Sequence, residues 1–229
     1  MKGEISIIIP VFNEESTIVE TVEKLKSALI DEVIIVDGGS SDRTIETAEA
    51  TGCNVIRSEK KGRAAQMNTG AGHASAPILY FLHSDTQPPE NFAEVIVEAA
   101  RTGADYGCFA LQFDDTQPVL KFFSLFTRLK TKWVRFGDQS LFVKKEIFER
   151  ISGFDESLIL MEDQEIYHRL EAAGKFRLLD GKVITSSRRY REIGVLKLQF
   201  FFTLIYLGYY LGVSHKTLLK FYTNHIRTE

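Results

Sequence analysis

The chain has 229 residues, of which 44% are hydrophobic and 26% charged, and its formal net charge is −3. This composition suits one domain with a sizeable core and excludes a disordered chain, a collagen-like chain and a small disulfide scaffold. Cys53 and Cys108 lie far apart without a metal-binding or redox spacing, so we expect free thiols, a reducing compartment and no zinc site. Glu4 interrupts the apolar start of the chain, which predicts a cytoplasmic protein rather than a secreted one.

The first half of the chain alternates short apolar runs with segments of helical periodicity. Strands are predicted at residues 5–11, 33–36, 55–56 and 78–82, and helices at 18–29, 42–51 and 63–74. Such short βαβ units predict an α/β fold with a doubly wound, mostly parallel sheet and flanking helices. Ligands of these sheets bind at the carboxyl ends of the strands.

The second half is less regular. Strands are predicted at 106–113 and 140–143, and helices at 119–136, 145–151 and 162–173. Two C-terminal helices, at 193–211 and 215–226, are expected to close the domain, with Gly212 between them.

Several nucleotide-binding and hydrolase motifs are missing. The first strand ends in PVFNEE rather than GxGxxG, which disfavours a dinucleotide-dependent dehydrogenase. The chain has no GxxxxGK[ST] and no GxSxG, so it carries neither a P-loop nor a nucleophile elbow.

Acidic residues at strand and helix ends are the remaining candidates for chemistry. Asp37 can accept a hydrogen bond from a base or ribose, or it only shapes a turn. Asp85 can hold Mg²⁺ or Mn²⁺ against phosphates, or it too is a turn residue. Glu162 and Asp163 begin a predicted helix, where they serve either as a general base or only to complement the dipole. That helix end is expected to keep Asp163 ionised.

Taken together, these segments resemble the family 2 glycosyltransferases. The matching stretches, in order, are IIIPVFNEE, VIIVDGGSSDRT, KGRAAQMNTG, YFLHSDT, FGDQSLFV and the Glu162-Asp163 pair. The resemblance implies a GT-A fold, a nucleoside-diphosphate sugar donor, a Mn²⁺ or Mg²⁺ ion and inversion at the anomeric carbon.

The resemblance also implies a role for each matching position. Asp163 would be the catalytic base, with Glu162 as the first alternative, and Asp85 the metal ligand. Asp37 would bind the base of the nucleotide, expected to be uracil. The full set of positions expected to surround the donor is Pro10, Val11, Phe12, Glu14, Asp37, Gly38, Arg63, Ser84, Asp85, Arg188 and Arg189. His83 stands where the family usually has the first Asp of Asp-x-Asp, and Ser186 and Tyr190 depart from a QxxRW motif, which argues against processive polymer synthesis.

We therefore expect a single GT-A domain over residues 1–229. Residues 1–115 would form the nucleotide-sugar-binding half, 116–190 the acceptor and catalytic half, and 191–229 the aromatic and basic C-terminal helices. Two alternatives stay open, a nucleotide-sugar-binding module without transferase activity and a nucleotide-sugar pyrophosphorylase. The pyrophosphorylase would need a glycine-rich loop after the first strand.

Two aromatic segments raise the question of a partner. Residues 119–136 interleave aromatic and basic side chains, and residues 198–213 are uncharged and rich in Phe and Tyr. Residues 186–229 carry seven Lys or Arg and two acidic residues, which suggests an anionic partner, although the acidic remainder argues against nucleic acid. The segments would pack in the core, form a homodimer, or lie on the cytoplasmic face of a membrane, in which case the acceptor would be a lipid or a lipid-linked molecule.

Overall fold

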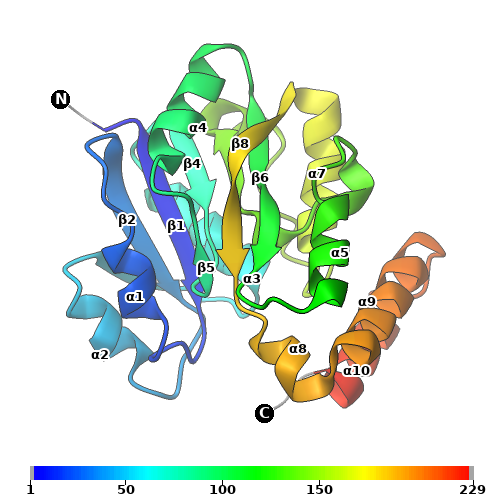
Figure 1. The fold of residues 1–229 in the computed structure, drawn as a ribbon. Coiled ribbons are helices and arrows are strands. Elements are labelled where there is room, and N and C mark those ends of the chain that lie inside the picture. The colour runs from blue at the N-terminus through cyan, green and yellow to red at the C-terminus, as the bar shows by residue number, and fades with distance from the viewer. Residues whose placement is uncertain (1–2, 227–229) are drawn as a thin grey trace.

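The computed structural model describes residues 3–226, which form an α/β domain around one eight-stranded sheet (Figure 1). The strand order is β3-β2-β1-β4-β7-β6-β8-β5. The strands are β1 (Ile5–Val11), β2 (Ile30–Asp37), β3 (Asn54–Arg57), β4 (Ile78–Phe81), β5 (Thr86–Gln87), β6 (Tyr106–Phe113), β7 (Leu141–Lys144) and β8 (Phe176–Thr185).

The sheet is mostly parallel, as predicted. Strands β3, β2, β1 and β4 run parallel to one another, and β6 pairs with β8 in parallel. Strand β7 is antiparallel to both β4 and β6, and β5 is antiparallel to β8. All seven residues of β1 are buried, which explains its continuous apolar sequence, since both faces of a central parallel strand are covered.

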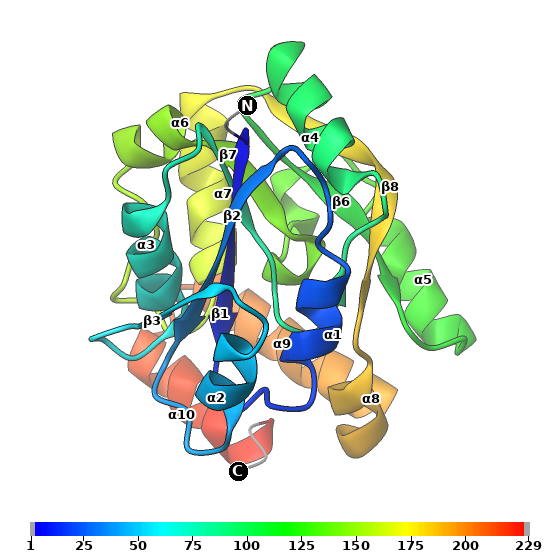
Figure 2. The same ribbon diagram turned by 90° about the vertical axis from the view of Figure 1, so that its left-hand side faces the viewer.

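Helices cover both faces of the sheet (Figure 2). Core residues of α1 (Ile18–Glu23), α2 (Thr44–Glu49), α4 (Phe92–Arg101) and α5 (Pro118–Phe126) pack on one face. Those of α3 (Arg63–His73), α6 (Lys145–Arg150) and α7 (Glu162–Ala173) pack on the other. This confirms the doubly wound arrangement.

The C-terminal helices form a separate small core. After α8 (Arg188–Ile193), the helices α9 (Val195–Tyr210) and α10 (His215–His225) bury Leu198, Ile205 and Ile226 between them. They lie near the carboxyl ends of the parallel strands, on the side of α5 (Figure 1). The two predicted closing helices are thus confirmed, with the short helix α8 before them.

The prediction of one helix over residues 119–136 is wrong. Helix α5 ends at Phe126, and residues 127–136 turn back through a short 3-10 segment at Lys132–Val134. The buried guanidinium of Arg135 explains the break, because it donates hydrogen bonds to the carbonyl oxygens of Thr127 (2.7 Å) and Leu129. Those carbonyls follow the helix, where no further turn of helix supplies donors, and the Gln139 side-chain amide adds a 3.3 Å hydrogen bond to that of Thr127.

Other elements did not follow from the sequence pattern. The predicted helix over 18–29 ends at Glu23, although Leu25 beyond it stays buried in the core. Helix α4 and strands β5 and β8 were not predicted. Strand β8 is interrupted by Asp180 and Gly181, which has a φ of 103°, and its register with β6 shifts there. The sequence Asp180-Gly181 is typical of a turn, so it did not indicate that one bulged strand continues on both sides of it.

Candidate active site

The carboxyl ends of β1, β2 and β4 meet at one edge of the sheet, where the sequence places its polar residues. Gln66 of α3 holds two of these ends together, since its side-chain amide donates to the carbonyl oxygens of Val11 and Val36, each at 2.8 Å. A Cβ at Gly38 would lie 2.9 Å from the Gln66 side chain. Only glycine therefore lets this loop pass so close to Gln66.

Asp37 lies at this edge, but its carboxylate is buried and engaged by its own turn. It accepts hydrogen bonds from the backbone N–H of Gly39 (2.9 Å) and Ser40 (3.0 Å). The guanidinium of Arg57 lies 3.5 Å from the same carboxylate. The role of Asp37 in binding the nucleotide base stays a prediction, and the geometry shows its turn-forming role.

The other residues expected to line the nucleotide pocket differ in how much of their surface is exposed to solvent. Pro10 and Val11 are buried in β1, and Ser84 is 5% exposed, with its carbonyl oxygen accepting from the hydroxyl of Thr21 at 2.6 Å. Phe12, in contrast, is 47% exposed. The ring of Phe12 is thus available to a ligand, whereas Pro10 and Val11 contribute to the packing beneath it.

Glu14, Asp85, Arg188 and Arg189 form a charged group, here called the donor cluster. The guanidinium of Arg188 lies 3.6 Å from the Glu14 carboxylate. Burial raises the pKa of Glu14 and the charge of Asp85 adds to this, while the Thr17 hydroxyl and the two arginines oppose it. The cluster joins segments more than 100 residues apart in sequence, and it combines cations with acids at the sheet edge.

The donor cluster suits a divalent cation that is shared with a phosphate ligand. Within residues 3–226, no group of three or more His, Cys, Asp or Glu side chains could hold a metal ion unaided. Asp85 nevertheless offers a carboxylate with only a long 3.4 Å contact to the Thr86 hydroxyl. Mg²⁺ is commonly held by one or two carboxylates together with substrate phosphates, and this donor set fits that pattern.

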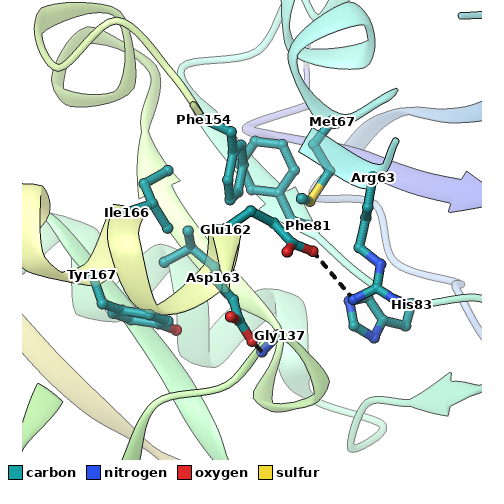
Figure 3. A pocket seen from close by; sticks show the side chains of 11 residues that line it. Arg63, Met67, Phe81, His83, Gly137, Phe154, Glu162, Asp163, Ile166 and Tyr167 are labelled. Carbon is teal, nitrogen blue, oxygen red and sulfur yellow. Dashed lines mark hydrogen bonds and ion pairs between the residues drawn. The ribbon is translucent and has the colours of Figure 1, made fainter. Parts of the chain in front are cut away.

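A pocket near the donor cluster gathers the other charged candidates (Figure 3). Arg63 comes from the start of α3, His83 follows β4, and Glu162 and Asp163 begin α7. The apolar part of the lining comes from Met67, Phe81, Leu141, Phe154, Ile166 and Tyr167. The structure therefore brings Arg63, Glu162 and Asp163 together, and we call this the carboxylate pocket.

The carboxylate of Asp163 is held at both oxygens. Gly137 donates its backbone N–H to Oδ2 and Gln164 donates to Oδ1, each at 2.7 Å. Burial nevertheless raises the pKa of Asp163, and these hydrogen bonds only reduce the rise. Desolvation thus outweighs the hydrogen bonds and the helix end in their effect on this pKa, and the ionised state of Asp163 stays a prediction.

Glu162 is more deeply buried and pairs with an arginine. Burial raises its pKa to about 7, while Arg63 opposes the shift with a guanidinium nitrogen 3.4 Å from Oε1. The neighbouring charge of Asp163 adds to the rise. Ionisation of either Glu162 or Asp163 therefore disfavours ionisation of the other, and Arg63 is the cation beside them.

Gly137 of the pocket and Asp138 next to it received no individual role from the sequence. The ring nitrogen Nδ1 of His83 donates to Asp138 at 2.9 Å, and a Cβ at Gly137 would lie 2.9 Å from the His83 ring. Burial raises the pKa of Asp138, but His83, Arg63 and Arg189 together lower it overall. The FGDQS stretch that contains Gly137 and Asp138 was the available signal.

Arg189 connects the two parts of the site. Its charge acts on Glu14 of the donor cluster and on Asp138 beside the carboxylate pocket. It also donates to the hydroxyl of Tyr222 on α10 at 2.9 Å. The arrangement places the cations Arg188 and Arg189 and the carboxylate of Asp85 near an oriented, partly buried acid, Asp163.

Comparison with known proteins gives a consistent picture. The chain is 31% identical over 192 residues to the succinoglycan biosynthesis protein ExoA of Rhizobium meliloti, covering 73% of this chain and 58% of ExoA. It superposes on the mannosyltransferase PcManGT from Pyrobaculum calidifontis, solved with GDP-Man and Mn²⁺, with a TM-score of 0.66, 17% identity and coverage of 90% and 65%. It superposes on S. aureus TarS 1-349, solved with UDP-GlcNAc, with a TM-score of 0.66, 16% identity and coverage of 80% and 58%.

The chain spans less than two thirds of each of these proteins. The structural neighbours confirm the expected GT-A fold. The family model for glycosyl transferase family 2 matches residues 6–153, which is more than half of the sequence. This chain belongs to glycosyl transferase family 2.

Proposed function

We propose that the protein transfers a sugar, with inversion, from a nucleoside-diphosphate sugar to an acceptor hydroxyl, and that Asp163 is the general base. The observation that carries this proposal is the Asp163 carboxylate, held at both oxygens by backbone N–H groups inside a pocket beside the donor cluster. PcManGT and TarS 1-349 were each solved with a nucleotide sugar, which supports the donor class. We assign UDP as the nucleotide and the cytoplasm as the place of action.

In the reaction, the acceptor oxygen forms a bond to the anomeric carbon while the bond from that carbon to the diphosphate breaks. The bonding electrons leave with the diphosphate, and the acceptor proton passes to the Asp163 carboxylate. Asp163 must be ionised to accept it, and the N–H groups of Gly137 and Gln164 stabilise that form against burial. Their two hydrogen bonds also orient the carboxylate toward one side of the pocket.

The leaving diphosphate needs positive charge, which Arg188 and Arg189 supply in the donor cluster. Asp85 would hold a Mn²⁺ or Mg²⁺ ion against the diphosphate oxygens, where the ion would neutralise the charge that develops on them. The exposed ring of Phe12, with Gly38 and Asp37 nearby in the β1 and β2 loops, would bind the nucleoside. Arg63 would hold the negative charge of Glu162 away from the acceptor oxygen.

A nucleotide-sugar-binding module without activity is the second candidate. Its pocket would not need an oriented acid, yet Asp163 is held at both oxygens at an energetic cost, because burial disfavours its charge. The pyrophosphorylase alternative is disfavoured by the family and by the loop PVFNEE after β1. We therefore favour the transferase.

The test is Asp163→Asn, which nearly preserves the shape of the side chain and cannot accept the proton. We expect donor affinity within a few-fold of wild type, and release of nucleoside diphosphate from UDP-sugars in the presence of Mn²⁺ reduced by roughly 10²–10⁴. Asp180→Asn, on an exposed residue of β8, is the matched control and should change neither quantity. If Asp163→Asn releases nucleoside diphosphate at a near-normal rate, the base lies elsewhere, and Glu162 is the first candidate. If the wild-type protein releases none from UDP- or GDP-sugars, the binding module is favoured.

A further inference from the structure

Helix α9 exposes a row of large apolar side chains. Leu196, Phe200, Leu207 and Leu211 are 71%, 59%, 51% and 82% exposed. Their spacing of four, seven and four residues places them on one side of the helix. The opposite side is the buried one that packs on α10. Helix α9 is therefore largely apolar on two opposite sides, and its own core covers only one of them.

Helix α5 and the turn after it expose a second row. Phe122, Leu125, Phe126 and Leu129 are 55%, 53%, 43% and 51% exposed, whereas Leu120 is fully buried under the helix. The rings of Phe122 and Phe126 pack against each other, with centroids 5.1 Å apart. This row therefore has ordered aromatic contacts of its own while it remains in solvent.

The two rows are joined by contacts between α9 and residues 133–136. The hydroxyl of Tyr206 donates to the carbonyl oxygen of Trp133 at 2.9 Å, and the Trp133 ring lies 5.0 Å from that of Tyr210. Trp133 itself is 49% exposed. Figure 1 shows α5 and α9 beside each other on the same side of the molecule. We call the exposed apolar side chains of α5, residues 127–136 and α9 the α5/α9 face.

Basic residues predominate at the edge of this face, where Lys132 is paired with Glu171 of α7. Residues 116–137 and 193–226 contain no Asp or Glu. Lys121, Arg128 and Lys130 are exposed on the α5 side, and among residues 3–226 none of the three has an acidic side chain within 4.0 Å. Lys197 lies at the α9 side. A partner that covers the face must therefore be apolar in its middle and negatively charged around it.

We propose that the α5/α9 face docks on an anionic lipid bilayer, with α5 and α9 lying in the plane of the interface. Exposed aromatic and aliphatic residues edged by Lys and Arg suit the boundary between headgroups and acyl chains. Within residues 3–226, no helix has the length and apolarity needed to cross a bilayer. A second copy of the chain fits less well, because a two-fold contact through this face would bring the same cations together.

Docking on this face also places the carboxylate pocket near the membrane. Helix α8 connects α9 to Arg188 and Arg189, and Tyr222 of α10 bonds directly to Arg189. If the proposed transferase function holds, a lipid or lipid-linked acceptor can reach the pocket along the same surface. The docking itself does not depend on that function, so the two can be tested separately.

The test is flotation of the full-length protein with vesicles of phosphatidylcholine alone or with about 30% phosphatidylglycerol, without donor or metal. We expect binding to the anionic vesicles at about 50 mM salt that falls at least tenfold at about 500 mM, because screening shortens the reach of the charges. Trp133 is the single tryptophan of the chain and lies on the α5/α9 face. Its fluorescence should shift to shorter wavelength on binding and be quenched by brominated acyl chains.

Substitutions distinguish binding through the α5/α9 face from an effect of the overall net charge of the protein. Arg128→Glu with Lys130→Glu, and Phe200→Ser with Leu207→Ser, should each reduce vesicle binding at least tenfold. Lys26→Glu with Lys175→Glu makes the same charge change at exposed sites just before β2 and β8, at the other end of the sheet, and should leave binding unchanged. Circular dichroism establishes that each variant is folded.

Three results would overturn the proposal. The first is wild-type protein that stays with the buffer at low salt in both vesicle types. The second is a dimer by light scattering that Phe200→Ser with Leu207→Ser converts to monomer while vesicle binding is absent, which would assign the face to a second copy. The third is equal loss of binding in the control pair, which would show that only overall charge matters.

Discussion

Glu162 shows how strongly burial can act on one residue. Its side chain is almost fully covered, and its pKa is raised by burial to about 7. An unfolded chain releases the same proton near the ordinary value of 4.5. Between these two pH values the folded state keeps a proton that the unfolded state has lost, so the contribution of Glu162 to stability is lost as pH rises through this window.

Glu162→Gln should therefore stabilise the protein at pH 8 more than at pH 5. The amide removes the cost of a buried charge, and the lost contact with Arg63 costs little because that side chain is 43% exposed. We expect the gain in unfolding free energy to be larger at pH 8 by about 1–3 kcal/mol, measured by urea denaturation at both pH values. The same change at both would show that Glu162 is ionised in the fold throughout.

Gly137 is a residue whose lack of a side chain matters. Its backbone N–H holds Asp163, and any Cβ would lie 2.9 Å from the ring of His83. Gly137→Ala should destabilise the protein by about 1–3 kcal/mol and lower turnover more than donor affinity. Gly72→Ala is the matched control, since a Cβ there meets open space on exposed α3 and should be neutral or stabilising. Equal effects of the two substitutions in thermal unfolding and donor-hydrolysis assays would contradict this account.

At the scale of elements, α5 and its turn depend on one buried arginine. Arg135 donates to carbonyl oxygens that follow α5, and its guanidinium lies 4.7 Å from the centre of the Phe176 ring. It thus anchors the turn from which the α5/α9 face extends toward α9. The aromatic periodicity of residues 119–136 predicted a continuous helix. Periodicity does not show that the Arg135 side chain folds back to the carbonyl oxygen of Thr127, eight positions earlier, where the helix ends.

Arg135→Met should destabilise the protein by about 2–4 kcal/mol, because a similar volume is kept while buried carbonyls lose their donors. The neighbouring exposed Arg128→Met should cost less than about 0.5 kcal/mol. Hydrogen exchange of residues 127–136 should increase in the first variant alone, and urea denaturation gives the free energies. Unchanged stability of Arg135→Met would mean that water replaces the guanidinium at those carbonyls.

At the scale of the whole molecule, the donor cluster exists only because the fold joins distant segments. Glu14 follows β1, Asp85 follows β4, and Arg188 begins α8. The division of the chain at residue 115 into a nucleotide-sugar half and a catalytic half stays a prediction, and Arg188 lies 3.6 Å from Glu14 across that division. A phosphate ligand at this edge would meet acids and cations together.

Donor binding should therefore depend on a divalent cation. Glu14 and Asp85 would repel a diphosphate without one. We expect EDTA, or Asp85→Ala, to weaken nucleotide-sugar binding at least tenfold, about 1.4 kcal/mol, by calorimetry. Asp180→Ala removes an exposed acid from β8 and should leave affinity unchanged. Unchanged nucleotide-sugar affinity after both treatments would show that Asp85 only shapes its turn.

The sequence by itself determined that the sheet is mostly parallel, which strands carry the polar loops, and the family. These follow from short windows, since the buried strand β1 needs an unbroken apolar run and the loop motifs are local. It also placed Arg63, Glu162 and Asp163 among the candidates that the structure brings into one pocket.

Only the tertiary structure decided how those groups are held. The turn engages the Asp37 carboxylate, Gly137 reaches Asp163 from 26 positions away, and burial raises the pKa of Glu162 and of Asp163. It also decided which aromatic residues of α5 and α9 face solvent, because helical periodicity does not tell which sides of a mostly apolar helix are covered. Burial and hydrogen-bond partners come from segments distant in sequence, so no local pattern records them.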